Sequence, residues 1–157
     1  MSTINGRACV ANGTPVNKVF SDGKQVYGRN YIKNSNQTIT INGDTQHYIT
    51  IYGSLTNEYW TFSADVKYTL GTDASVFLSI YSAGTKIVYN NASVPIVNGK
   101  IAWTFKPNDP AGVQLLMYAS SGAWGTTPGK ILEVRHRRLE KGSVVTPYSI
   151  APEDVLK

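Results

Sequence analysis

The sequence predicts an all-β protein, an antiparallel β-sandwich, on three observations. Apolar residues recur at every second position in several short runs, which is the spacing of a half-buried strand. Turns built from Asn, Asp, Gly and Pro separate these runs at short intervals, as they do in sandwiches. The chain is also poor in charged residues, at 16%, and holds 10 tyrosines, a composition that favours strands over helices.

The length of 157 residues fits one domain with a single sizeable core. Cys9 is the only cysteine, so no disulfide can form within the chain. No apolar run approaches the ~20 residues of a membrane-spanning helix, and the start of the sequence lacks the apolar segment of a secretion signal. We therefore expect a protein made in the cytoplasm without a cleaved leader, with no membrane partner.

Residues 1–29 predict a β-hairpin with a role in attachment. The β-prone runs 16–20 and 24–27 flank Asp22-Gly23, and Asp-Gly between such runs is the strongest short-range hairpin signal. A two-stranded ribbon is marginal in water by itself, so it must pack on the main domain or on a partner. We expect residues 1–29 to be an attachment segment and residues 30–157 to be a separate module.

The sequence of residues 30–157 predicts a succession of β-strands. The clearest is 60–68, where five apolar residues alternate strictly with polar ones. Trp60 and Trp103 both fall in such alternating patterns and are expected in the core. The last residues, 152–157, could form one helical turn. The other expected strands are 48–52, 76–80, 86–89, 101–105, 113–117 and 131–139.

The C-terminal run LEKGSVVTPYSIAPED, residues 139–154, resembles the closing signature of a family of phage domains. These are the carbohydrate-binding-module-like jelly rolls in tail, baseplate and receptor-binding proteins of phages that infect Gram-positive, lactic-acid-type bacteria. The chain has Tyr148 where Trp is common and Ile150 where Pro is common. Residues 16–30 likewise resemble the connecting segment before such modules. The signature positions that the chain keeps are Leu139, Glu140, Lys141, Gly142, Thr146, Tyr148, Pro152, Glu153 and Asp154.

The resemblance implies a jelly roll in a phage tail that binds host cell-wall polysaccharide without turnover. Its partners would be that polysaccharide and other phage tail proteins, and its location the virion. The alternative is a purely structural tail or baseplate module that mediates protein–protein assembly. Modules of this kind commonly hold a structural calcium ion, for which oxygen-rich turns offer ligands, but no ligand spacing here is diagnostic. No other cofactor is implied.

Trp124 is the first candidate for contact with a sugar, because it lies in a loop otherwise made of small and turn-forming residues. A large exposed indole is unfavourable unless it packs or binds, and aromatic faces suit the C–H faces of pyranose rings. We expect it either to stack on a sugar or to cover the edge of the sandwich. Tyr118, just before this loop, and Tyr89 and Asn91, at a strand end, are secondary candidates.

Arg135 and Arg137 are the basic candidates, in the densest positive cluster of a chain with net charge +5. Alternation along a strand puts these two on one face, and His136 and Arg138 on the other. The cluster is either a solvated strand, with the arginine stems covering apolar surface, or a contact for acidic sugars or wall phosphate. We expect no nucleic-acid partner, since no recognition helix is predicted.

The sequence offers no catalytic set, and we expect no enzyme. His47 and His136 are the only histidines, and no serine lies in a Gly-x-Ser-x-Gly context. The ten acidic residues fall mostly in turns, where Asp forms the turn itself, so a pair of carboxylates for glycoside hydrolysis is not indicated.

Overall fold

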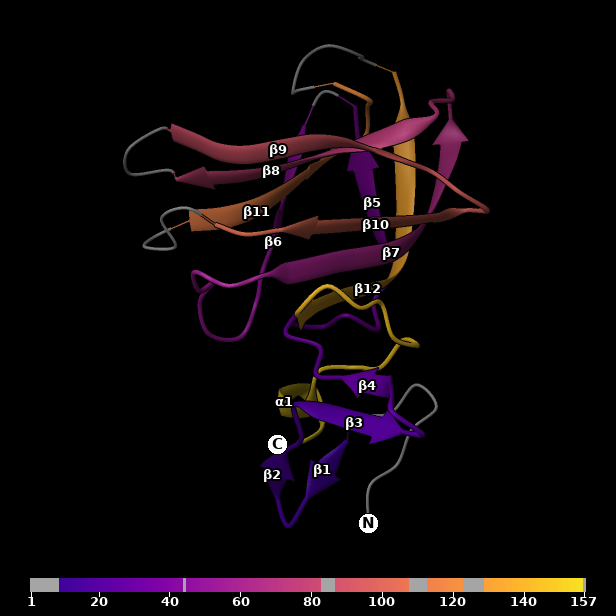
Figure 1. Ribbon diagram of the computed structural model, residues 1–157. Coiled ribbons are helices and arrows are strands. Elements are labelled where there is room, and N and C mark those ends of the chain that lie inside the picture. Colours follow the sequence, from indigo (N-terminus) through magenta and orange to yellow (C-terminus); the bar gives the residue numbers. More distant parts are fainter. Residues whose placement is uncertain (1–8, 44, 83–86, 108–112, 123–128, 157) are drawn as a thin grey trace.

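The protein is a two-layer antiparallel β-sandwich. The computed structural model describes residues 9–43, 45–82, 87–107, 113–122 and 129–156 (Figure 1). One sheet has the order β10-β7-β12-β5 and the other β6-β11-β8-β9. The first contains β5 (Ile39–Asn42), β7 (Trp60–Leu70), β10 (Lys100–Phe105) and β12 (Ile131–Lys141). The second contains β6 (Gln46–Ile49), β8 (Ser75–Ser82), β9 (Ile87–Pro95) and β11 (Val113–Tyr118).

The strand order is that of a jelly roll, as the resemblance implied. From β5 to β12, each connection crosses to the opposite sheet except the hairpin between β8 and β9. Eight strands wound in this way form two Greek keys that share one core. The single described helix, α1 (Pro152–Val155), is one turn, as predicted, and none of the described helical structure is long enough to cross a membrane.

The core lies between the two sheets and is built from the alternating residues of the predicted strands. Trp60 and Phe62 of β7 are fully buried there, facing Leu78 of β8 and Leu115 of β11 in the same cluster. The prediction for Trp60 is therefore confirmed. Trp103 is only half-buried, because its strand, β10, lies at the edge of the sheet and has a neighbouring strand, β7, on one side only. It packs on Phe105, with ring centroids 4.6 Å apart.

The N-terminal hairpin is confirmed, and a smaller one precedes it. β3 (Lys18–Ser21) pairs with β4 (Lys24–Gly28), and Asp22 and Gly23 both take positive φ, 49° and 74°, as a type I′ turn requires. β1 (Val10–Ala11) and β2 (Thr14–Pro15) form the shorter hairpin. Figure 1 shows all four strands and α1 at the same end of the molecule.

Residues of the C-terminal signature join the N-terminal segment to the tail that follows β12. Glu140 is fully buried and accepts hydrogen bonds from Arg138 Nε, at 3.0 Å, and from Thr146 Oγ1, at 2.7 Å. The same Thr146 hydroxyl accepts a bond from the Gly28 amide, at 3.1 Å. A Cβ at position 28 would overlap with Glu140 Oε1, so any larger residue would displace this buried carboxylate. The network therefore closes β4 onto the tail.

Asn30 forms a second link at the same joint. Its buried amide donates to the carbonyls of Arg137 and Ser149, and its oxygen accepts from the amides of Ile32 and Leu139. All the polar atoms of this side chain are thereby satisfied, as burial requires.

Further along the tail, Glu153 and Asp154 make contacts of the same kind. Glu153 pairs with Arg29, and Asp154 accepts bonds from the Asn34 amide, at 3.0 Å, and the Tyr52 hydroxyl, at 2.6 Å. The signature thus builds a joint between residues 28–34 and the tail. A functional division of the chain at residue 30 remains a prediction.

Candidate functional site

Four aromatic side chains lie on the outer face of the β6-β11-β8-β9 sheet. Core residues alternate with them along the strands, so Phe77 and Tyr81 of β8 and Tyr118 of β11 point away from the core. Tyr48 of β6 lies opposite Leu116, in the next row of the same face. We refer to Tyr48, Phe77, Tyr81 and Tyr118 as the aromatic face.

The aromatic face contains one buried ring, Tyr118, and one exposed ring, Tyr48. Tyr118 lies directly opposite Phe77, with ring centroids 5.6 Å apart in an edge-on arrangement, and is only 8% exposed. Burial, and after it the neighbouring Tyr48 and Tyr81, raise the pKa of Tyr118, so its hydroxyl stays protonated. Tyr48 is 43% exposed, and its hydroxyl accepts a hydrogen bond from Gln46 Nε2 at 2.8 Å.

Amide side chains surround these rings. Gln46 lies opposite Tyr118, and Gln114 opposite Tyr81, and both amides are exposed. Asn91 lies opposite Ser79 and is also exposed. Because residues directly opposite one another share a face, these amides border the aromatic face with donors and acceptors. An apolar ring floor with amides at its edge is suited to a ligand with both C–H and hydroxyl groups.

The structure thus brings together two of the sugar-binding candidates, Tyr118 and Asn91. Tyr89 belongs to β9, but its side chain, like all of Trp124, lies outside the described residues. Arg135 and Arg137 belong to the other sheet, so they do not join this face. Sequence analysis missed Phe77 as a site residue because it alternates within a strand read only as core.

The expectation that Arg135 and Arg137 share one face is wrong, because a β-bulge interrupts the alternation. Arg135 lies opposite Asp65 in the sheet, and Arg138 lies opposite Ser63. Between these two positions β12 holds one residue more than β7, and His136 takes a φ of 49°. Arg135 is exposed and pairs with Glu133 at 2.8 Å, whereas Arg137 is buried.

Arg137 has a structural role at the joint. Its guanidinium donates to the Asn34 carbonyl at 2.8 Å, which holds the segment after Asn30 against β12. Burial lowers the pKa of this side chain, partly offset by Tyr148. Its buried position removes Arg137 from the surface that a wall polymer could contact.

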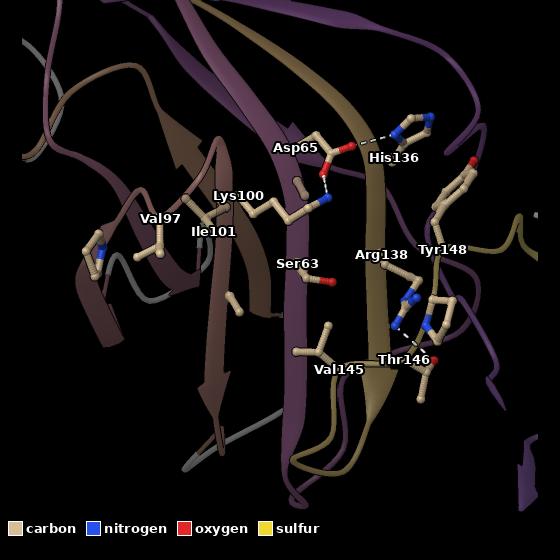
Figure 2. A pocket seen from close by; sticks show the side chains of 14 residues that line it. Ser63, Asp65, Val97, Lys100, Ile101, His136, Arg138, Val145, Thr146 and Tyr148 are labelled. Atoms are coloured by element: carbon tan, nitrogen blue, oxygen red, sulfur yellow. Dashed lines mark hydrogen bonds and ion pairs between the residues drawn. The ribbon is translucent and has the colours of Figure 1, made fainter. Parts of the chain in front are cut away.

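A groove lies on the outer face of the other sheet (Figure 2). It has a volume of about 760 Å³ and is bounded by β10, β7, β12 and the tail. Asp65 of β7 lines the groove, with Lys100 Nζ 2.6 Å from one carboxylate oxygen and His136 Nδ1 2.6 Å from the other. Burial alone would raise the pKa of Asp65, but the hydrogen bonds from His136 and Lys100 outweigh it and lower that pKa.

The two histidines have different surroundings. No described hydrogen bond joins His136 to a hydroxyl, and the nearby Glu140 is held by Arg138. His47 is half-buried on β6, and burial, with the charge of Arg137 second, lowers its pKa. Within the described ranges, no three His, Cys, Asp or Glu side chains gather as metal ligands would.

Asp73 links Ser121 to Lys130. Its carboxylate accepts from the Ser121 amide at 2.9 Å, and from Lys130 Nζ at 2.8 Å. Burial alone would raise the pKa of Asp73. The hydrogen bonds from Lys130, Ser121 and Ala74 outweigh burial and lower the pKa to about 2. Asp73 therefore stabilises the folded state as an anion.

We expect this carboxylate to make stability fall in acid. Its folded pKa of about 2 lies below its ordinary value of 3.8, so its contribution is complete above about pH 4 and is lost as the pH falls towards 2. Asp73→Asn should lower the free energy of unfolding at pH 7 by about 2 kcal/mol, and by much less at pH 2. Denaturant titrations of both proteins at the two pH values measure this, and an equal loss at both would contradict it.

A scan against protein-family models and a search of curated proteins gave no match. Among solved structures, the chain is similar to the tripod (BppUct-A-L) from the baseplate of bacteriophage Tuc2009, with 20% identity and a TM-score of 0.49. The similarity covers 80% of this chain and 59% of the other. A likeness of this degree does not transfer a function.

Proposed function

We propose that the protein is a non-catalytic carbohydrate-binding module. The aromatic face carries the proposal: it places Tyr48, Phe77, Tyr81 and Tyr118 on one outer sheet face, bordered by exposed amides. Aromatic rings pack on the apolar faces of sugar rings, and amides pair with sugar hydroxyls. The buried Tyr118 ring supports Phe77 edge-on, so little side-chain entropy is lost when a ligand settles on the Phe77 ring.

We further propose that the ligand is a cell-wall polysaccharide of a Gram-positive host and that the module belongs to a phage tail. The support is the C-terminal signature, whose retained residues build the joint described above. An open sheet face buries little of each sugar, so single sugars should bind weakly. Many copies on one particle would then give firm attachment by multiplying a modest affinity.

Replacing Tyr48 with alanine should weaken binding to the polysaccharide roughly fivefold, the effect of losing one aromatic contact. Tyr48 is the most exposed ring of the face, so its removal should leave the melting temperature nearly unchanged. Retention of wild-type and Tyr48→Ala protein on purified wall polysaccharide measures the effect. Tyr59→Ala is the matched control, because Tyr59 is an exposed tyrosine outside the aromatic face. Equal loss in both variants would exclude the aromatic face as the site.

The second candidate is a structural module that mediates assembly with other phage tail proteins. One observation favours it: Phe20, on β3 of the N-terminal hairpin, is a large apolar side chain left exposed. Exposed aromatic residues of this kind are typical of protein contacts. Absence of retention of the wild-type protein on the walls of Gram-positive bacteria would favour this candidate.

A further inference from the structure

The groove on the β10-β7-β12 face has apolar walls that no part of the described chain covers. Val97 reaches it from the turn between β9 and β10, and Val145 from the tail (Figure 2). These two side chains are 61% and 52% exposed. Exposed apolar side chains on two sides of a hollow are unfavourable in water, and a ligand that fills the hollow would remove them from it.

The floor of the groove is formed by small side chains and leaves room for a ring. Ser63 of β7 and Ala102 of β10 are directly opposite one another and both line the groove. Because these side chains are small, a ligand can approach the sheet closely at this point. The half-buried ring of Tyr148 adds an aromatic wall, 4.7 Å between centroids from the His136 ring.

The charges of the groove select a neutral, polar ligand. Arg138 lines it but is already neutralised by Glu140. The Asp65 carboxylate repels anions, and Lys100 beside it repels cations. Asp65 and Lys100 nevertheless offer an acceptor and a donor side by side, since a carboxylate accepts several bonds and an ammonium donates three. Adjacent hydroxyl groups on one ring match this pair.

We propose that this groove binds a neutral saccharide residue, with the ring over Ser63 and Ala102 and two of its hydroxyls on Asp65 and Lys100. The two sheets pack face to face, so the groove and the aromatic face point in opposite directions. The groove site goes beyond the proposed function and does not depend on it. A protein with both sites could hold two glycan segments at once, which raises its avidity for a polymer.

The test is a set of amide chemical-shift titrations of the full-length, isotope-labelled protein with glucose, galactose, rhamnose and N-acetylglucosamine. With at least one of these sugars, we expect shifts at the amides of Ser63, Ala102 and His136. Asp65→Asn should weaken that binding roughly tenfold, by removing a hydrogen bond to a charged group. Ala102→Trp should abolish it, by filling the floor. Tyr48→Ala should leave the groove shifts unchanged.

Thr69→Trp is the matched control for Ala102→Trp, because Thr69 is an exposed residue of β7 outside the groove. Should Asp65→Asn or Ala102→Trp unfold the protein, Lys100→Gln serves instead, because the Lys100 side chain is largely exposed; it should weaken binding severalfold. Absence of groove shifts with all four sugars, or shifts that persist in Ala102→Trp, would overturn the proposal. Loss of wall retention in Tyr48→Ala concerns only the aromatic face, so failures of the two proposals are distinguishable.

Discussion

Replacing Glu140 with alanine should lower the free energy of unfolding by roughly 3–5 kcal/mol, because it leaves the Arg138 charge buried without a partner. The change also removes the acceptor of the Thr146 hydroxyl, which holds Gly28 and so the N-terminal segment. Denaturant unfolding at neutral pH measures the loss.

Glu133→Ala is the control for that substitution. Glu133 pairs with Arg135 on the same strand, but neither side chain is buried, and that of Arg135 is 56% exposed. Its loss should cost under about 1 kcal/mol, the usual range for surface ion pairs. Similar losses in the two variants would show that the Arg138–Glu140 pair does not behave as a buried one.

Trp60→Ala should cost roughly 3–5 kcal/mol, as expected for a large aromatic side chain removed from a core. Trp60 is fully buried, its Nε1 donates to the Thr56 carbonyl at 3.1 Å, and its ring meets Tyr31 edge-on at 5.2 Å. Trp103→Ala is the comparison, and should cost less because the edge strand leaves that indole half-exposed. Denaturant midpoints in the reverse order would contradict this description of the core.

Much of the fold could be predicted from local patterns. Strict alternation identified β7 and β10, and Asp22-Gly23 identified the hairpin of β3 and β4. β5 was missed, because Ile39 and Ile41 give an alternation of only four residues with no long run beside it. Its place is fixed instead by pairing with β12, a contact distant in sequence.

The candidate sites were predicted less well, because register decides them. The bulge at His136 reverses which side Arg137 faces, and one residue more on β12 leaves no clear trace in its sequence. The groove brings together Asp65, Lys100 and Tyr148 from two strands and the tail, which no spacing along the chain reveals. Tyr118 and Asn91 lie on the same sheet face, and their role in binding stays a prediction.

The C-terminal signature also acquires a physical explanation. Glu140 and Thr146 are buried in the network at the joint, and Asp154 binds the Asn34 amide. Gly142 takes a φ of 102°, which side chains disfavour, and its carbonyl accepts from Thr61 Oγ1 at 2.7 Å. A signature built from such contacts reports how the tail is attached to the sandwich. It does not identify a ligand.

Hydrogen–deuterium exchange of the wild-type protein, with and without purified Gram-positive wall polysaccharide, tests the central claim most directly. Glycan binding at the aromatic face predicts slower exchange in peptides that cover β6, β8 and β11, with the hairpin of β3 and β4 unchanged. Unchanged exchange throughout the aromatic face, with the polysaccharide in excess, would contradict the proposed function.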